Sequence, residues 1–454
     1  MQTPSKKAPT RQPSKKAPAR QPSKSKTVPT RQPSKKAPTH KRSKKAPTRQ
    51  PSKKAPTQHP TTKAPTPTLT TKPPTPKPAT KPPNPWQGKY LRIANKVSGF
   101  GLLAGSHGTN PDDRQMWQYP FSETGPNAKG FEWMLMPTFE GPYLIINRVS
   151  GFGLLAGSYG SGGDRKVWQY PVTELGGNNP DGFRWSVEAH GDAFRIVNIA
   201  SGFALLAGSY GAGGDRLVWQ YPLSEVGSNE DAFLWALQET GQRFNVPELR
   251  PGEAEGAMPL DVPRLRSITD VPVSKSESWV MGEVLIPFMY VKDGAVSNQL
   301  RANPYYVLCR ERYWSQIDLN EYDGRLQRKE KVTVKTGITE TQSRSLENEL
   351  GIKISADASF SYGGMASASL KTEIENRLKV TETSGVTKSR EEETIVEITV
   401  PNETVRIVTW VMVERFTLKR GDASLVGQPS EVTLKSFVHD SYPHKEISHT
   451  VMAG

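Results

Sequence analysis

The chain has 454 residues, of which 35% are hydrophobic, with 39 prolines, 38 glycines and a formal net charge of +15. This composition is too poor in apolar residues for one globule, so we expect two or three domains and an unfolded portion. Residues 1–85 hold 22 of the 60 Lys and Arg and no Asp or Glu, which leaves 38 basic against 45 acidic residues elsewhere. The charge pattern therefore does not support a broad phosphate-binding surface on the folded part.

Cys309 is the only cysteine, which excludes an internal disulfide and a cysteine-based zinc cluster. We expect its thiol to be free and buried. The sequence has no stretch of about 20 apolar residues for a spanning helix, and residues 1–10 lack the apolar segment of a secretory signal. If this protein reaches a membrane, we expect it to arrive from water.

Residues 1–85 consist of variants of Pro-Ser-Lys-Lys-Ala-Pro-Thr-Arg-Gln, followed by Thr-Lys-Pro-Pro repeats. They hold almost no aromatic or branched apolar side chains, so burial cannot offset the entropy that ordering would cost. We predict a disordered basic N-terminal tail that serves as a solvated spacer. A weak contact of this tail with a polyanion, driven by counterion release, is a secondary hypothesis.

Residues 86–241 contain an internal repeat with a period near 51 residues. Each copy has a Ser-Gly-Phe turn, then Trp-Gln-Tyr-Pro, and closes with Phe-x-Trp. The short apolar runs are β-type and are separated by Gly, Asn and Asp, with no helical period. Units of this size cannot bury a core alone, so we predict that the three close about a pseudo-threefold axis.

These repeats resemble the ricin-B-type β-trefoil family, through their length, the opening segment 90–99 and the closing tryptophan. The resemblance implies a carbohydrate-binding module. The sequence departs from the family's galactose-binding pattern at two positions of each repeat. Leucine replaces the sugar-holding Asp and phenylalanine replaces the closing Gln, at Leu103, Leu155, Leu206, Phe131, Phe183 and Phe233.

Another set of residues in each repeat is a candidate ligand site. An Asp-Arg pair precedes Trp and Tyr, which share one face of a strand because side chains alternate with period two. A flat ring beside charged groups suits a sugar or a lipid headgroup, and three copies would provide avidity. The alternative is that the rings belong to the trefoil core and that the Asp-Arg pairs brace the turns. The candidate residues are Asp113, Arg114, Trp117, Tyr119, Asp164, Arg165, Trp168, Tyr170, Asp215, Arg216, Trp219 and Tyr221.

A linker over residues 242–265 leads to a domain over residues 266–454 that is rich in Ser, Thr and Val. Strand patterns cover residues 280–291, 330–341 and 394–400, and the run 404–418 is apolar on both faces, as in a buried strand. The predicted fold class is all-β, with a disordered tail, a β-trefoil and an elongated β-sheet domain.

The segment 346–380 has the pattern of an amphipathic β-hairpin, with apolar residues at even positions on both sides of Gly363-Gly364. Arms of about 9–11 residues match a transmembrane hairpin. A single hairpin would leave backbone groups unpaired in lipid, so several copies would have to close into a barrel. The candidate membrane-facing residues are Ile352, Ile354, Ala356, Ala358, Phe360, Ala366, Ala368 and Leu370.

Two other interpretations of this segment remain open. Leu346 and Leu350, and likewise Leu370, Ile374 and Leu378, lie four residues apart, which fits short amphipathic helices on either side of a small loop. A half-buried hairpin of an ordinary sandwich would show the same alternation.

The block 333–409 resembles the aerolysin and epsilon-toxin/Mtx-type β-pore-forming proteins, in which Thr- and Ser-rich strands flank an insertion hairpin. Their Val-Pro-x-x-Thr-Val element matches residues 400–405. A trefoil followed by such a module resembles haemolytic mushroom lectins and some insecticidal bacterial toxins. The resemblance implies a pore-forming, toxin-like lectin. It would be released as a soluble protein, bind cell-surface glycans or glycolipids, form a homo-oligomer and insert into the target membrane from outside the cell.

Other classes of function remain open. No His-Glu-x-x-His, Gly-x-Ser-x-Gly or phosphate-loop motif is present, so we expect neither an enzyme nor a cofactor. His439, His444 and His449 suggest a pH-sensitive patch more than a metal site. The alternatives to pore formation are a non-lytic multivalent lectin whose C-terminal domain only oligomerises, and an intracellular protein that binds nucleic acid through its tail.

Overall fold

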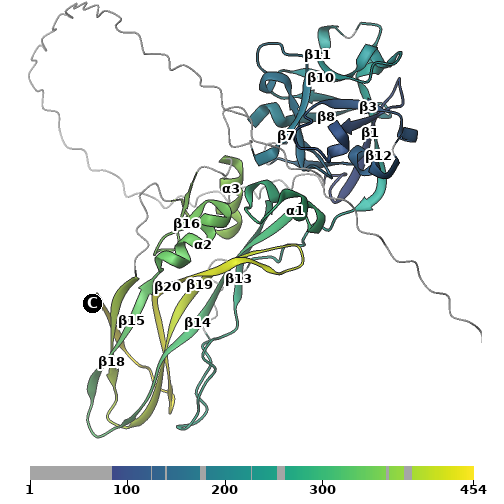
Figure 1. Cartoon of the computed structure of the whole chain (residues 1–454). Helices are drawn as coiled ribbons and strands as arrows, with labels where there is room; N and C mark the ends of the chain where they lie inside the picture. Colours follow the sequence, from purple (N-terminus) through teal and green to yellow (C-terminus); the bar gives the residue numbers. More distant parts are fainter. Residues whose placement is uncertain are drawn as a thin grey trace, which may run out of the picture. The chain divides into compact units, whose positions relative to one another are not determined.

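The computed structural model describes residues 84–453 except 124, 139–140, 174–179, 226, 253–260, 364–367 and 383–390. The predicted tail over residues 1–85 therefore lies almost entirely outside the described residues. Two strand-rich modules follow it, a trefoil module from β1 to β12 and a C-terminal module from β13 to β21 (Figure 1). Strands dominate both modules, which confirms the predicted all-β class.

The trefoil module is built from three repeats of four strands each. The first repeat holds β1 (Lys89–Asn95), β2 (Gly101–Ala104), β3 (Met116–Tyr119) and β4 (Trp133–Pro137). The second holds β5 (Tyr143–Asn147), β6 (Phe152–Ala156), β7 (Val167–Pro171) and β8 (Arg184–His190). The third holds β9 (Ala193–Asn198), β10 (Phe203–Ala207), β11 (Val218–Pro222) and β12 (Leu234–Arg243).

Six of these strands close a ring of antiparallel pairs in the order β1, β4, β5, β8, β9, β12 and back to β1. The remaining strands form the hairpins β2–β3, β6–β7 and β10–β11. Backbone bridges between Trp117 and Leu217 and between Lys166 and Trp219 join these hairpins to one another. A six-stranded barrel with three hairpins about one axis is the predicted β-trefoil.

The repeated sequence motifs account for this closure. The closing tryptophans Trp133, Trp185 and Trp235 are fully buried, and each indole donates a hydrogen bond of 2.9 to 3.0 Å to a carbonyl of its own repeat's first hairpin strand. Asn147, also fully buried, donates to the carbonyl of Gly130 and accepts from two amides of the following turn. A buried amide that satisfies the backbone in this way fixes each turn, since unpaired buried polar groups are costly.

The C-terminal module is a seven-stranded antiparallel sheet in the order β13-β14-β19-β20-β15-β18-β21. Its strands are β13 (Trp279–Pro287), β14 (Tyr305–Asp323), β15 (Arg328–Gly337), β18 (Glu391–Val400), β19 (Thr404–Lys419), β20 (Leu425–Tyr442) and β21 (His449–Ala453). Its helices are α1 (Val296–Ala302), α2 (Glu340–Leu350) and α3 (Ala368–Leu378). Figure 1 shows α2 and α3 together at one end of the long strands.

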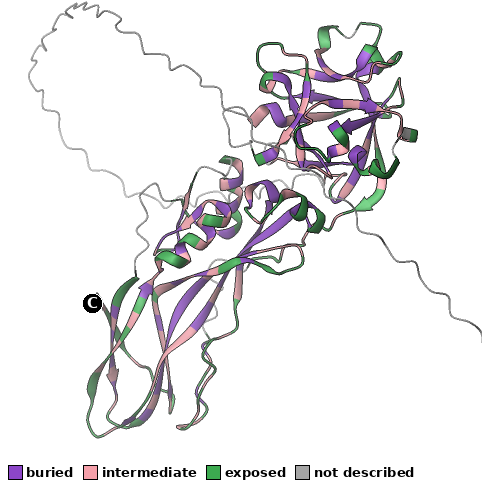
Figure 2. Ribbon diagram, in the orientation of Figure 1, coloured by how far each residue is buried: buried purple, intermediate pink, exposed green. Residues whose placement is uncertain are grey.

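Most strands expected in this module are present. The predicted strands 394–400 and 404–418 correspond to β18 and β19, and β19 is buried along most of its length, as Figure 2 shows. The predicted strand 280–291 is present as β13 but ends at Pro287, where a 3-10 turn follows. The predicted strand 330–341 is shorter, because β15 ends at Gly337 and α2 begins at Glu340. Cys309 is a buried free thiol on β14, as expected, and burial raises the pKa of this thiol to about 12.

Residues 338–390 leave the sheet after β15 and return to it at β18; we call this segment the excursion. Its described part consists of α2, the two short strands β16 (Ile352–Ile354) and β17 (Phe360–Tyr362), and α3. The prediction of one long hairpin over residues 346–380 is therefore wrong for this fold, and the alternative of short amphipathic helices around a small loop is confirmed. The physical reason is that Leu346, Leu350, Leu370, Ile374 and Leu378 are spaced for a helix as well as a strand, and all five are buried.

Candidate functional site

The candidate ligand residues of the trefoil lie on β3, β7 and β11. In each of these strands the Trp and Tyr are half-buried, while the residues on either side of the Trp are buried. The prediction that the two rings share one face is confirmed. This face carries the Trp117–Tyr119 pair in an edge-on contact, with ring centroids 6.5 Å apart.

The arginines do not stand beside the aromatic residues of their own repeat. The Arg114 guanidinium lies 4.6 Å from the ring centre of Tyr170, and Arg165 lies 4.1 Å from Tyr221. Arg216 completes the circle at 4.6 Å from Tyr119. Each arginine thus stacks on the tyrosine of the next repeat, and such cation–π contacts stabilise the seams between repeats.

The aspartates brace the turns that precede these strands. The Asp113 carboxylate accepts hydrogen bonds from the Ser106 hydroxyl at 2.8 Å and from the Gln115 amide at 3.2 Å. Asp164 and Asp215 accept the equivalent bonds in the other repeats. The alternative that these residues brace the turns therefore holds for the aspartates, whereas the arginines stack between repeats. Ligand binding at the half-buried rings stays a prediction.

The positions that depart from the galactose-binding pattern are part of the core. Leu103, Leu155 and Leu206 are at most 4% exposed. Phe131, Phe183 and Phe233 are at most 1% exposed. A sugar hydroxyl has no access to such side chains, so any ligand of this module must bind elsewhere on its surface.

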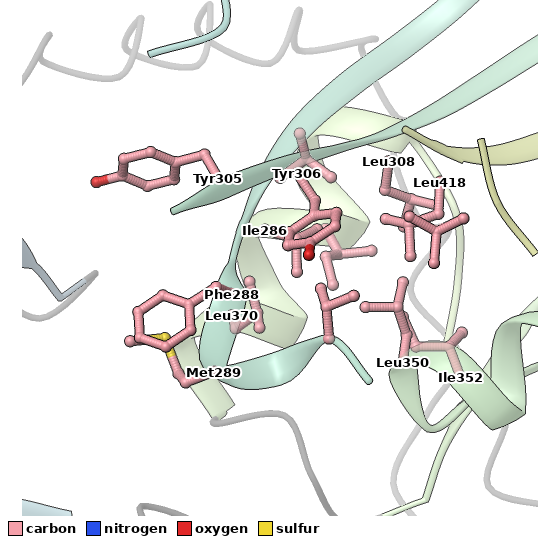
Figure 3. Packing of buried hydrophobic residues seen from close by; sticks show 14 of the residues in the cluster. Ile286, Phe288, Met289, Tyr305, Tyr306, Leu308, Leu350, Ile352, Leu370 and Leu418 are labelled. Atoms are coloured by element: carbon pink, nitrogen blue, oxygen red, sulfur yellow. The ribbon is translucent and has the colours of Figure 1, made fainter. Parts of the chain in front are cut away.

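The candidate membrane-facing residues of the excursion are mostly buried. Ile352, Ile354, Ala358 and Phe360 are at most 6% exposed, Leu370 is 1% exposed, and Ala356 is half-buried. Figure 3 shows Leu350 and Ile352 directed towards Leu308 and Leu418 of the sheet. Ala368 lies exposed at the start of α3, and Ala366 lies outside the described residues.

The turn between β16 and β17 is centred on Asp357. Hydrogen bonds from the hydroxyls of Ser355 and Ser359 hold the pKa of the Asp357 carboxyl below its usual range. Ala358 follows with φ of 62°, a left-handed conformation that non-glycine residues adopt at a cost of about 1–2 kcal/mol. This turn therefore holds some backbone strain.

The excursion joins two strands that are direct neighbours. β15 and β18 pair antiparallel through ten consecutive residue pairs, from Arg328 opposite Val400 to Gly337 opposite Glu391, without a bulge. The even-numbered residues of both strands are the more buried ones along most of the pair. The excursion thus begins and ends at adjacent positions of one uninterrupted hairpin.

The sequence did not identify a charged group that contacts the excursion. Arg310 on β14 is paired with Glu414 on β19, and both side chains are buried. The available signal was a run of charged residues inside each strand, at 310–312 and 414–415. Such a run can be buried only if its charges pair across the sheet.

Among residues 84–453, apart from the gaps given above, no helix is long and apolar enough to cross a membrane. In the same part of the chain, no group of three or more His, Cys, Asp and Glu side chains is arranged to hold a metal ion.

The fold defines a two-module all-β protein, with a trefoil followed by a long-stranded sheet that carries a helical excursion. Residues 279–444 match the family described as Insecticidal Crystal Toxin, P42. The crystal structure of Cry35Ab1 superposes with a TM-score of 0.59 at 18% identity, over 79% of this chain and 91% of that one. This likeness indicates a shared fold.

Two curated relatives come from Lysinibacillus sphaericus. The binary larvicide subunit BinA is 28% identical over 192 residues, which are 40% of this chain and 50% of BinA. The binary larvicide subunit BinB is 26% identical over 208 residues, which are 45% of this chain and 43% of BinB. The chain spans about half the length of the curated relatives it matches.

Proposed function

We propose that this chain is an insecticidal toxin whose C-terminal module forms membrane pores after the trefoil binds a cell-surface glycan or glycolipid. The larvicidal names of BinA and BinB and the matching crystal-toxin family support the toxin role. The observation that carries the membrane step is the register of β15 and β18. In outline, the excursion straightens and lengthens this hairpin, and several chains assemble their hairpins into a barrel.

The register fixes where each residue of a straightened excursion would lie. In every β15–β18 pair the two residue numbers add up to 728. If the same register continues, Tyr362 is opposite Ala366 and the turn falls at residues 363–365, which include Gly363 and Gly364. Three-residue hairpin loops favour glycine because one position adopts a left-handed conformation. The sequence therefore has a turn where the register requires one.

The projected hairpin separates apolar from polar residues. Because 728 is even, even-numbered residues pair with even-numbered ones and share a face. The odd-numbered face consists mainly of Ser, Lys, Glu and Asp, and Asn376 and Thr372 interrupt the apolar face. The apolar pairs would be Leu350 with Leu378, Ile354 with Ile374, Ala358 with Leu370 and Phe360 with Ala368.

The polar face of the projected hairpin is also complementary in charge. Opposite charges directly across a pair of strands contribute about 0.2–1 kcal/mol each, and like charges destabilise. All three pairs of charged residues between 349 and 379 would match a base with an acid. They are Glu349 with Lys379, Lys353 with Glu375, and Asp357 with Lys371.

The resting fold does not require this complementarity. Lys353 lies on β16 and Glu375 on α3. Burial raises the pKa of Glu375, and the positive charge that partly lowers it again is that of Lys371. Lys371 in turn pairs with Glu382 at 3.8 Å. These opposite-charge pairs would therefore stabilise the straightened hairpin.

A charge-swap series tests the proposal. Lys353→Glu and Glu375→Lys each place like charges opposite one another, which costs about 1 kcal/mol per chain and slows pore formation roughly fivefold. The double variant restores the pair. We expect dye leakage from phosphatidylcholine vesicles that contain neutral glycosphingolipids to fall in each single variant and to recover in the double variant.

The vesicle composition supplies the control for the trefoil. Vesicles without glycolipid should leak much less, because the proposed surface ligand is missing. Equal leakage by the wild type and both single variants would contradict the projected register, and a wild type that leaks no vesicle would contradict pore formation.

A further inference from the structure

One buried arginine joins the end of α3 to the centre of the sheet. Arg310 on β14 is 6% exposed, and its guanidinium donates to the carbonyls of Leu378 at 2.7 Å and Lys379 at 2.6 Å. The same guanidinium donates to both carboxylate oxygens of Glu414, at 2.9 and 2.6 Å. Glu414 is 1% exposed and is also bonded to Arg312. Arg310 therefore links the end of α3, at Leu378 and Lys379, to strands β14 and β19.

The chain is shaped to bring the end of α3 to this arginine. A Cβ at Gly282 on β13 would lie 2.0 Å from the carbonyl oxygen of Arg377, so a side chain there would push α3 away. Lys379 has φ of 52°, a left-handed conformation that ends the helix without a glycine. The last carbonyls of a helix lack partners within the helix, and a cation is the favourable group to place there.

We propose that Arg310 and Glu414 form a latch that holds α3 in the resting fold, and that the opening of this latch frees the excursion. This inference rests on the proposed function only for its consequence at the membrane. In the projected hairpin Leu378 and Lys379 pair with Leu350 and Glu349, so their carbonyls must leave Arg310 before the excursion can straighten.

The turn between β16 and β17, in the middle of the excursion, borders an open pocket. This pocket has a volume of about 420 Å³ and is lined by Ala356 and Asp357 together with residues of β15, β18 and β20. Atoms that face such a pocket make fewer packing contacts than atoms in a close-packed interior. The turn around Asp357 therefore has fewer contacts to break on this side than the buried end of α3 has at Arg310.

The test replaces Arg310 by Lys in the full chain. A lysine ammonium retains the charge but cannot bond two carbonyls and a carboxylate in the same fixed geometry. Hydrogen bonds to charged groups are strong enough for this loss to increase local opening by about tenfold or more. We expect hydrogen exchange at the amides of α3 to accelerate by that factor, while exchange in the trefoil strands stays unchanged.

A matched control lies on the same two strands. Arg415 on β19 bonds Glu311 on β14 at 2.7 Å and Ser278 at 3.1 Å, and none of its hydrogen bonds within the described residues reaches the excursion. Arg415→Lys should lower overall stability by a similar amount without accelerating exchange in α3. If both variants accelerate exchange in α3 equally, the latch is refuted.

Glu414→Gln is the second variant, for the case that Arg310→Lys does not fold. It replaces one of the two acceptor oxygens by an NH2 group, which cannot accept a hydrogen bond from the guanidinium. It also removes the charge that orients Arg310, so it should likewise accelerate exchange in α3. Leakage from the glycolipid vesicles separates the two proposals. Faster exchange in α3 with faster leakage supports both, whereas faster exchange in α3 without any leakage supports the latch and contradicts pore formation. Unchanged exchange in α3 refutes the latch whatever the leakage.

Discussion

His439 is held in its neutral form by its surroundings. Its ring lies against that of His449, with centroids 4.8 Å apart, and its Nδ1 is 3.0 Å from the Thr409 hydroxyl. Burial, with a smaller contribution from the charge of His449, lowers the pKa of His439 to about 4. The sequence suggested a pH-sensitive patch from three histidines. The contact between His439 on β20 and His449 on β21 was not predictable from their spacing, because β15 and β18 lie between these strands in the sheet order.

Acidification should therefore destabilise the C-terminal module. An unfolded histidine titrates near 6.5, so the unfolded state binds a proton in the window from about pH 6.5 to 4 in which folded His439 does not. Stability is fully present above this window and falls by at most about 3 kcal/mol through it. Denaturant unfolding at pH 7 and pH 4.5 measures the loss, which His439→Gln should reduce. An equal loss in the variant would assign the pH dependence to other groups.

The residues of the trefoil show which contacts a sequence can predict. The shared face of Trp117 and Tyr119 follows from the period of a strand, and it was predicted correctly. The stacking of Arg216 on Tyr119 joins the last repeat to the first, so it depends on closure of the barrel. Local spacing contains no such information, so the sequence did not predict that each arginine stacks on a tyrosine of the next repeat.

At the scale of elements, the excursion shows why strand and helix were confused. Residues four apart share a face in an α-helix and also in a β-strand, so Leu370, Ile374 and Leu378 fit both periods. In the resting fold α3 buries these residues against the sheet module. The same ambiguity is what a segment needs if it is to be helical at rest and extended in a membrane.

A pair of substitutions distinguishes the two faces of the projected hairpin. Ala356→Asp places a charge on the membrane-facing side, at a position that is only half-buried in the resting fold. A charge at mid-depth in the bilayer costs on the order of 1–2 kcal/mol per chain for an acid, so we expect leakage to fall roughly tenfold or more.

Ser361→Asp makes a similar change on the water-facing side and should leave leakage within about twofold of the wild type. Thermal unfolding of both variants checks that the resting fold is intact. Equal loss of leakage in the two variants would contradict the assignment of faces.

Two long strands were not predicted, and both depart from simple alternation. β14 carries Arg310, Glu311 and Arg312 in its centre, where ion pairs with β19 replace apolar contacts. β20 contains Gly427 and pairs with β19 through two irregularities in register. A pattern based on hydrophobicity cannot recognise a strand whose burial depends on charges from its neighbour.

At the scale of the whole molecule, the repeat period predicted closure about a pseudo-threefold axis, because each copy contains its own turns and closing tryptophan, and the resemblance to the ricin-B-type family supplied the trefoil. For the C-terminal module the residue pattern predicted β-strands but not their order. Its strand order depends on pairings between residues far apart in sequence, such as β14 with β19. The proposed toxin combines a surface-binding module with a sheet in which one hairpin, β15–β18, can lengthen.

The proposal that the β15–β18 hairpin lengthens in the membrane is tested most directly by measuring which residues of the two arms lie opposite one another there. Cysteines would replace Lys353 and Glu375, which the register places directly opposite one another, in a chain whose only native cysteine is changed by Cys309→Ser. A second chain would carry cysteines at Lys353 and Lys371, which the register separates by four residues. After assembly on glycolipid vesicles and mild oxidation, we expect a disulfide in the first chain and little in the second. Equal crosslinking of the two chains, or a disulfide confined to the second, would contradict the projected register.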